Sequence, residues 1–140
     1  MFDVCCALIF HQGKLLAVQR GANSDHSGQW EFPGGKIETG ETAVACIRRE
    51  VGEELELRVD VEAYLFPQYH NYGFRQIRLY PFVCRAKQLQ IKLNEHVNLC
   101  WVEVGELKML NWQEADFRLI EKNEATILEW FGKNNDNGCE

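Results

Sequence analysis

Hydrophobic residues near the start of the chain fall into two short runs separated by a turn. Residues 3–10 are rich in Val, Ile, Leu and Phe, and residues 15–19 form a second apolar run after the turn-like sequence HQGK. Two such runs joined by a Gly-containing turn predict a β-hairpin. A polar loop over residues 21–28 then leads to a short strand at 30–32, which is expected to stop at the Pro-Gly-Gly sequence of residues 33–35.

The clearest helix is expected over residues 42–55. Val44, Ile47, Val51 and Leu55 recur at spacings of three and four, which places them on one face of a helix. Thr42 has the side chain of a helix N-cap, since its hydroxyl can accept a hydrogen bond from a free backbone amide. This segment is therefore predicted to be an amphipathic helix that packs on a sheet.

The rest of the chain adds three strands and one helix. Strands are predicted at 57–66, 74–85 and 97–102, with a turn at 70–73 between the first two. An amphipathic helix is expected over 117–131, with these residues facing inward: Leu119, Ile120, Ile127, Leu128 and Phe131. Strands mixed with two helices, without strict alternation, predict an α+β sandwich around a mixed sheet. Residues 1–131 are expected to form one domain, and residues 132–140 a polar tail.

Composition and charge narrow the possible functions. The 140 residues are 46% hydrophobic and 26% charged, which is typical of a globular domain. The longest apolar run covers only residues 4–10, so we expect no membrane segment, and no secretory signal is visible. The formal net charge of −6 disfavours binding to a nucleic-acid polymer, and a polyphosphate would be repelled unless divalent cations intervened. Six cysteines without any C-x-x-C pair are expected to be reduced thiols of a cytoplasmic protein.

Two local patterns could carry chemistry. Glu50, Glu53 and Glu54 are neighbours on the predicted helix because they are three and four residues apart. The cluster is either a solvated acidic surface or a set of oxygen ligands for a divalent cation. The Gly34-Gly35 pair before the helix is either a simple turn or a backbone segment that a phosphate or metal can approach closely.

The spacing of these patterns resembles a known family. Residues 35–57 read GKIETGETAVACIRREVGEELEL. This segment matches eight of the nine fixed positions of the Nudix hydrolase box, and the preceding WEFPGGKIE is similar to the segment that enters the box in MutT-type members. The exception is Glu56, where the family has a glycine that ends the helix, so the form of the helix C-terminus is open.

The resemblance implies an α/β/α sandwich and a set of roles around a bound Mg²⁺ or Mn²⁺. The expected metal ligands are Gly35 through its carbonyl, Glu50, Glu53, Glu54 and Glu95. Either Glu53 or Glu95 would act as general base, with Arg49 orienting a carboxylate and Glu41 supporting Arg49. Glu95 resembles a late-loop ligand of MutT-like enzymes, but it could equally be an ordinary surface carboxylate.

By the same resemblance, the substrate would be a nucleoside triphosphate that is hydrolysed to a monophosphate and pyrophosphate. The expected substrate-binding residues are Arg20, Phe32, Gly34, Arg75 and Asn123. For Arg20 and Asn123, exposed polar positions without a ligand are the alternative. Oxidised purine triphosphates such as 8-oxo-dGTP and cytidine triphosphates both fit, and the expected assembly is a monomer or homodimer. The alternatives are a pyrophosphatase for ADP-ribose or a dinucleotide, and a non-catalytic domain that binds nucleotide.

Overall fold

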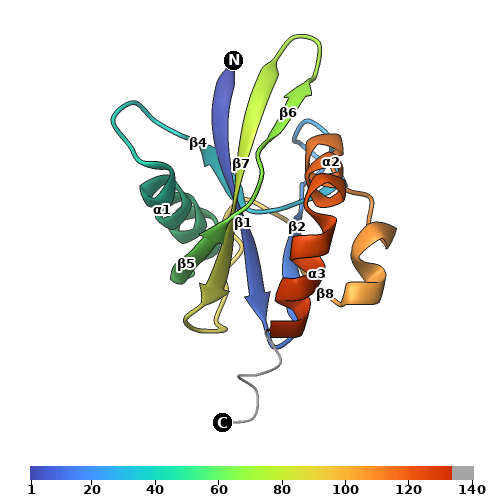
Figure 1. Cartoon of the computed structure of the whole chain (residues 1–140). Coiled ribbons are helices and arrows are strands. Elements are labelled where there is room, and N and C mark those ends of the chain that lie inside the picture. Colours follow the sequence, from blue (N-terminus) through green and yellow to red (C-terminus); the bar gives the residue numbers. More distant parts are fainter. Residues whose placement is uncertain (134–140) are drawn as a thin grey trace.

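The computed structural model describes residues 1–133 and arranges them around one eight-stranded sheet (Figure 1). In chain order the elements are β1 (Phe2–His11), β2 (Lys14–Gln19), β3 (Trp30–Glu31), β4 (Gly34–Lys36), α1 (Ala43–Leu55), β5 (Val59–Tyr64), β6 (Gln68–Asn71), β7 (Gln76–Ala86), β8 (Asn98–Val102), the 3-10 helix η1 (Val104–Met109), α2 (Glu114–Lys122) and α3 (Glu124–Lys133).

Strands β1 and β7 form the centre of the sheet. They pair in parallel from Phe2 opposite Ile77 to Phe10 opposite Arg85, whereas the other strand pairs are antiparallel. The main path of the sheet is β3-β2-β1-β7-β5, with β4, β6 and β8 attached to β1, β7 and β2 respectively. The prediction of a mixed sheet is therefore confirmed.

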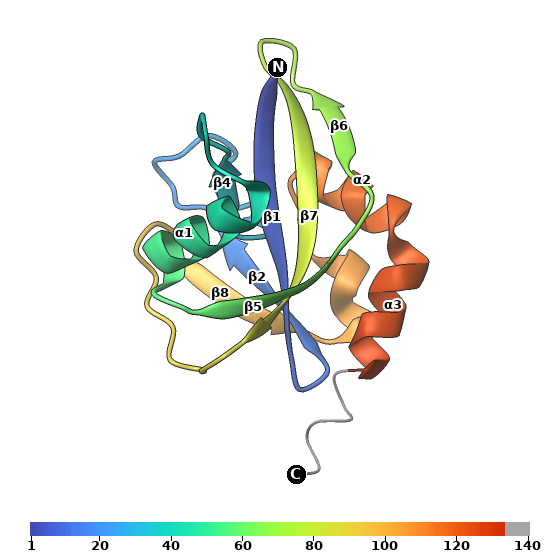
Figure 2. The same cartoon turned by 60° about the vertical axis from the view of Figure 1, so that its left-hand side comes forward.

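Strand β1 contributes to two separate cores, one on each face of the sheet. Its residues 5, 7 and 9 belong to the core that contains Ile47, Val51 and Leu55 of α1. Its residues 6, 8 and 10 belong to the core that contains Leu119 of α2 and Ile127 of α3. Successive side chains of a strand point to opposite faces, so this apolar strand is buried on both sides. Figure 2 shows α1 on one side of the sheet and α2 and α3 on the other, which confirms the α/β/α sandwich.

Both ends of α1 are capped. The Thr42 hydroxyl accepts a 3.1 Å hydrogen bond from the Ala45 amide, as its position predicts. At the other end Glu56 takes the left-handed conformation, with φ 50° and ψ 41°, and its amide donates to the Gly52 carbonyl. This conformation is the one that glycine adopts most readily at a helix end. The helix therefore ends in the usual way, although its capping residue carries a side chain.

Three expectations about local structure need correction. The helix predicted over 117–131 is two helices that meet at Asn123, and Leu128 is 43% exposed instead of facing inward. A strand, β4, occupies residues 34–36 where the chain was expected to turn. Strand β6 extends to residue 71, so the turn begins later than predicted. Residues 132 and 133 belong to α3, and the remainder of the predicted tail lies outside the described residues.

Composition led to two further expectations. Cys5, Cys6, Cys46, Cys84 and Cys100 are free thiols, and the first four are buried. Cys139 lies outside the described residues. Within residues 1–133, no helix is both long enough and apolar enough to cross a membrane.

Candidate active site

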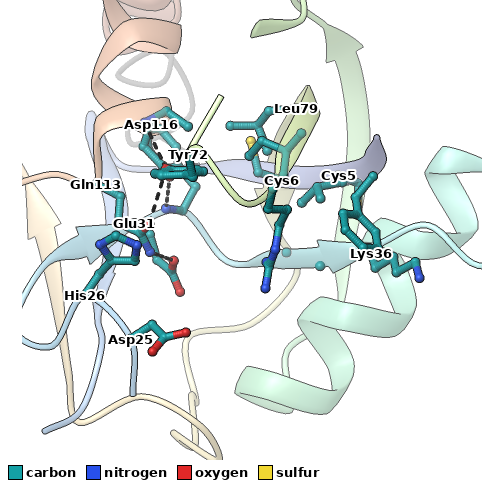
Figure 3. Close-up of a pocket in the computed structure, with 18 of the residues that line it drawn as sticks. Cys5, Cys6, Asp25, His26, Glu31, Lys36, Tyr72, Leu79, Gln113 and Asp116 are labelled. Atoms are coloured by element: carbon teal, nitrogen blue, oxygen red, sulfur yellow. Dashed lines mark hydrogen bonds between the residues drawn. The ribbon is translucent and has the colours of Figure 1, made fainter. Parts of the chain in front are cut away.

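A cavity of about 400 Å³ opens beside β1, β4 and α2. Its walls come from β1, the segment 31–36, β7 and the start of α2, together with residues of the loop 21–28 and of the β6–β7 turn. Figure 3 shows Glu31, Gln113, Asp116 and Tyr72 gathered at one end and Lys36 at the other. The two ends therefore differ in charge, and a ligand that spans them needs hydrogen-bonding groups at one end and negative charge at the other.

The acidic end is built from three polar side chains that contact one another or the backbone. Gln113 Nε2 donates to Glu31 Oε1 at 2.7 Å, and the Phe32 amide donates to Asp116 Oδ2 at 2.8 Å. Burial, together with the nearby Glu31 charge, raises the pKa of Asp116 to about 8, although the Phe32 amide opposes the shift. Asp116 is therefore largely protonated at neutral pH, and can donate as well as accept a hydrogen bond.

The other end of the cavity carries two cations beside aromatic rings. Lys36 Nζ lies 4.7 Å from the centroid of the Phe2 ring, and the Arg75 guanidinium carbon lies 5.5 Å from it. The Phe74 side chain next to Arg75 is exposed. Both cations line the cavity, and positive charge of this kind suits a phosphate chain.

Arg20, Phe32 and Gly34, which were expected to bind substrate, also line the cavity. Arg20 is held in place by its Nε, which donates to the Asp25 carbonyl at 2.6 Å, and by its Nη1, which lies 3.3 Å from Glu31 Oε1. Of the five residues expected to bind substrate, four line the cavity (Arg20, Phe32, Gly34 and Arg75), and Asn123 does not.

Next to the cavity, Arg49 contacts three carboxylates of the Nudix-like segment. Its Nε and Nη2 pair with Glu41 at 2.6 and 2.9 Å. Its Nη1 lies 2.9 Å from Glu50 and 3.3 Å from Glu53. The Arg49 contact lowers the pKa of Glu41 to about 2, so this pair stays ionised at any ordinary pH.

Glu54 is the buried member of the acidic cluster. Its side chain lies on the buried face of α1, and within residues 1–133 its Oε1 atom has no hydrogen-bond partner. Burial raises the pKa of Glu54 well above its usual range, and contact with Glu50 and the charge of Glu95 add to the shift. A buried carboxylate oxygen without a partner is costly unless a cation binds it.

Gly35 connects this cluster to the cavity. It lines the cavity, and a Cβ atom at this position would collide with the Glu50 carboxylate. Within residues 1–133 no three acidic, histidine or cysteine side chains already converge as an ion site, and Glu50 and Glu53 face Arg49 instead. The absence of a Cβ at Gly35 lets the Glu50 carboxylate approach the backbone. These oxygen donors, with the Glu54 oxygen that lacks a partner among the described residues, fit a hard divalent cation.

Glu95 lies near the same cluster. It is exposed, and its charge contributes to the raised pKa of Glu54. The neighbouring Asn94 amide donates to the Glu54 carbonyl at 2.9 Å, which attaches this loop to the end of α1. The structure therefore brings Glu95 close to the helix glutamates, as expected of a shared site.

Asn123 is not placed at the cavity, and the expectation that it contacts substrate needs correction. Its Oδ1 accepts from the Phe66 amide at 2.9 Å, while its Nδ2 donates to the carbonyls of Phe66 and Leu119. The side chain is 4% exposed, and no donor or acceptor group is left for a base. Asn123 instead joins the break between α2 and α3 to the β5–β6 connection.

Sequence analysis missed Glu31, Gln113 and Asp116, which form the acidic end of the cavity. Glu31 lies 82 positions before Gln113, so no local motif contains all three residues. Asp116 did carry a signal, because it lies three and four residues before Leu119 and Ile120, on the buried face of α2. A carboxylate on the same helix face as core residues is unusual, and it indicates a buried functional site.

Comparison with known proteins agrees with this geometry. The family model described as the NUDIX domain matches residues 2–122. The chain belongs to the Nudix family. Among curated proteins, this Nudix domain is similar to the CTP pyrophosphohydrolase of Escherichia coli, with 33% identity over 121 residues that cover 86% of this chain and 90% of the relative. It is also similar to a putative 8-oxo-dGTP diphosphatase 2 of Mycobacterium tuberculosis, with 35% identity and 73% of each chain covered.

Solved structures give the same result for the fold of this Nudix domain. The Escherichia coli ORF135 protein superposes with a TM-score of 0.78 and 31% identity, covering 92% of each chain. The MutT protein of Methanosarcina mazei Go1 superposes with a TM-score of 0.81 at 23% identity, covering 90% of this chain and 94% of the other. The protein is therefore a Nudix hydrolase of the MutT and CTP pyrophosphohydrolase type, and such hydrolases generally use divalent metal ions.

Proposed function

We propose that this Nudix hydrolase converts a nucleoside triphosphate to a nucleoside monophosphate and pyrophosphate, and thereby removes unwanted nucleotides from the cellular pool. The observation that carries the proposal is the position of Gly35, which lines the cavity and also lies against Glu50 of α1. A nucleotide in the cavity would thus have its phosphates beside the acidic cluster. The names of the related CTP pyrophosphohydrolase and 8-oxo-dGTP diphosphatase support this reaction class.

The acidic end of the cavity suits a base that carries N–H groups. Glu31 offers acceptors, Gln113 offers a carbonyl oxygen, and Asp116 can accept or donate. Cytosine presents an exocyclic amine beside a ring acceptor, and guanine presents adjacent ring and exocyclic N–H groups. We therefore assign cytidine or guanine-type triphosphates, including 8-oxo-dGTP, as the substrate class.

The phosphate chain would extend toward Gly34 and Lys36. Lys36 and Arg75 supply positive charge at that end of the cavity, and the glycine backbone allows close approach. Arg20 adds a third cation near the base end, although its contacts with Asp25 and Glu31 already use part of the guanidinium. In this arrangement the triphosphate would lie between the base site and α1.

The cation, Mg²⁺ or Mn²⁺, would be held by Glu50, Glu53, Glu54, Glu95 and the Gly35 carbonyl. When bound, a divalent ion neutralises phosphate charge, acidifies water and stabilises the leaving oxygen. Glu53 or Glu95 would take the proton from the attacking water, since both carboxylates are exposed to solvent at the cluster. Arg49 would hold Glu50 and Glu53 in place.

The test is pyrophosphate release from a panel of natural and oxidised nucleoside triphosphates, with Mg²⁺ or with EDTA. We expect metal-dependent release that is fastest for a cytidine or guanine-type triphosphate. Glu53→Gln should abolish pyrophosphate release while leaving the circular dichroism spectrum unchanged. The matched control is Glu129→Gln, which changes an exposed residue of α3 and should leave release unaltered. Release that survives in Glu53→Gln, or that ignores EDTA, would overturn the metal assignment.

A further inference from the structure

His96 follows Glu95 directly, and its side chain contacts Glu31 in the cavity wall. The side chain is only 6% exposed, and its Nε2 atom lies 2.8 Å from Glu31 Oε2 at the base end of the cavity. Glu31 accepts hydrogen bonds, so the Nε2 atom must be the donor in this contact. One residue thus links the loop of the expected catalytic carboxylate to the wall of the base site.

Glu31 is held from several directions. Its Oε1 atom accepts from Gln113 at 2.7 Å, and Arg20 Nη1 lies 3.3 Å from Oε1 and 3.4 Å from Oε2. His96 contributes the shortest contact to Oε2. A carboxylate with donors on both oxygens has little rotational freedom, so a shift of His96 changes the position of Glu31 and a shift of Glu31 changes that of His96.

The loop on the other side of Glu95 is fixed to α1. The Asn94 amide donates to the Glu54 carbonyl, and its Nδ2 donates to the Glu53 carbonyl, both at 2.9 Å. Glu95 itself is exposed and lies between these anchors and His96. The loop that carries Glu95 is therefore attached to α1 through Asn94 and to the base site through His96, and the Val97 amide donates to the Gln19 carbonyl at 3.0 Å.

We propose that His96 is a positioning residue that couples occupation of the base site to the placement of Glu95 beside the metal-binding glutamates. The proposal rests on the proposed function, because it takes Glu95 as part of the catalytic cluster. A base that contacts Glu31 stabilises the Glu31–His96 contact and with it the catalytic position of the loop. His96 thereby favours turnover of a triphosphate that carries a base over one that does not.

The buried Nδ1 atom of His96 supports a role beyond filling space. Nδ1 has no hydrogen-bond partner among the described residues, and Nε2 contacts Glu31. An apolar side chain would avoid this cost in a purely structural position. The imidazole is therefore better explained by the hydrogen bond that it donates than by packing.

The experiment compares the wild type with His96→Gln, whose amide nitrogen can still reach Glu31, and with His96→Leu and His96→Asn, which cannot donate to it. Turnover is measured on CTP, on 8-oxo-dGTP and on ribose 5-triphosphate, which lacks a base. We expect Leu and Asn to lower kcat on the better nucleotide about 30-fold and to leave kcat on ribose 5-triphosphate within about threefold. Gln should restore nucleotide turnover to within about threefold of the wild type.

Equal loss on both kinds of substrate, a change in KM alone, or no rescue by Gln would overturn the coupling. Amide hydrogen exchange of residues 94–97 gives a readout that does not need turnover, and we expect it to accelerate at least about tenfold in Leu and Asn but not in Gln. Unchanged exchange would also overturn the proposal. A wild type that releases no pyrophosphate from any nucleotide would instead defeat the proposed function, and the exchange result would still decide the role of His96.

Discussion

Arg49 and Glu41 face each other through two contacts, with Nε 2.6 Å from Oε2 and Nη2 2.9 Å from Oε1. This paired geometry fixes the plane of the guanidinium group. The remaining nitrogen, Nη1, is then directed at Glu50 and Glu53. Glu41 therefore acts on the acidic cluster indirectly, by orienting the residue that orients the carboxylates.

Replacing Arg49 by lysine should separate the effect of its positive charge from the effect of its paired hydrogen bonds. Lysine keeps the positive charge but cannot make paired contacts with a carboxylate. We expect Arg49→Lys to lower kcat of pyrophosphate release by about 10- to 100-fold. Arg48→Lys, an exposed neighbour on the same helix, should stay within about twofold of the wild type. Equal activity of the two variants would contradict a geometric role for Arg49.

We predict that the buried Glu54 side chain serves as a metal ligand and lowers the stability of the metal-free protein. Its buried Oε1 has no hydrogen-bond partner among residues 1–133, and its pKa is raised because burial disfavours the charge. Glu54→Gln should therefore raise Tm in EDTA by about 3–6 °C, because the neutral amide has no charge for burial to disfavour. The same variant should lose at least about 100-fold in activity. A lower Tm, measured by differential scanning calorimetry, would show that Glu54 is not strained by burial.

Asp116 should make stability depend on pH. Its pKa of about 8 in the folded protein lies above the ordinary 3.8, because of burial and the Glu31 charge, opposed by the Phe32 amide and Arg20. Between these values the folded state binds more protons than the unfolded state, so the free energy of unfolding falls as pH rises. The slope from this one group reaches at most about 1.4 kcal/mol per pH unit.

Urea unfolding of the wild type and Asp116→Asn at pH 5.5, 6.5 and 7.5 measures this effect. Other titrating groups are shared by both proteins and cancel in the difference. We expect the variant to gain stability relative to the wild type as pH increases. If the free energy of unfolding changed equally with pH in both proteins, Asp116 would ionise at its ordinary pKa.

Glu56 offers a way to stabilise the protein outside the site. Glycine adopts the left-handed conformation of this residue without strain, while the exposed carboxylate contacts Asn94 at 3.1 Å and Lys92 at 3.9 Å. We expect Glu56→Gly to raise the free energy of unfolding by about 0.5–1 kcal/mol with activity within about twofold. Glu56→Ala removes the same contacts but keeps a Cβ atom, so it should give no gain. A gain in both would attribute the effect to the lost charge.

Asn123→Ala should change stability and leave base preference unaltered. The variant removes three hydrogen bonds to backbone groups and leaves buried partners unpaired, which costs about 2–4 kcal/mol. The ranking of nucleotides by kcat/KM should match that of the wild type, because Asn123 does not line the cavity. A change in that ranking, without loss of stability, would restore the original interpretation of this residue.

The parts of the fold that could be predicted are those set by local pattern. Helix α1 was recognised because Ile47, Val51 and Leu55 repeat at helical spacing and Thr42 caps the start. The break at Asn123 was missed because Leu119, Ile120 and Ile127 are apolar on both sides of it, and the hydrogen bonds that stabilise the break come from Phe66, more than fifty residues away.

The candidate site divides in the same way. The acidic cluster of α1 lies within a few residues and was visible in the sequence, as was its partner Arg49. Strand β4 was missed because Gly34 and Gly35 have low strand propensity, and their pairing with Cys5 and Cys6 is a tertiary effect. The link between Glu31 and His96 spans 65 positions, so no spacing rule could reveal it.

The double burial of β1 restricts how this chain can evolve. Residues 5, 7 and 9 serve one core and residues 6, 8 and 10 serve the other. Inserting or deleting one residue here would turn every later side chain of β1 to the opposite face of the sheet, where it would pack against the other core. One apolar residue can therefore replace another along this strand, but the length of the strand cannot change.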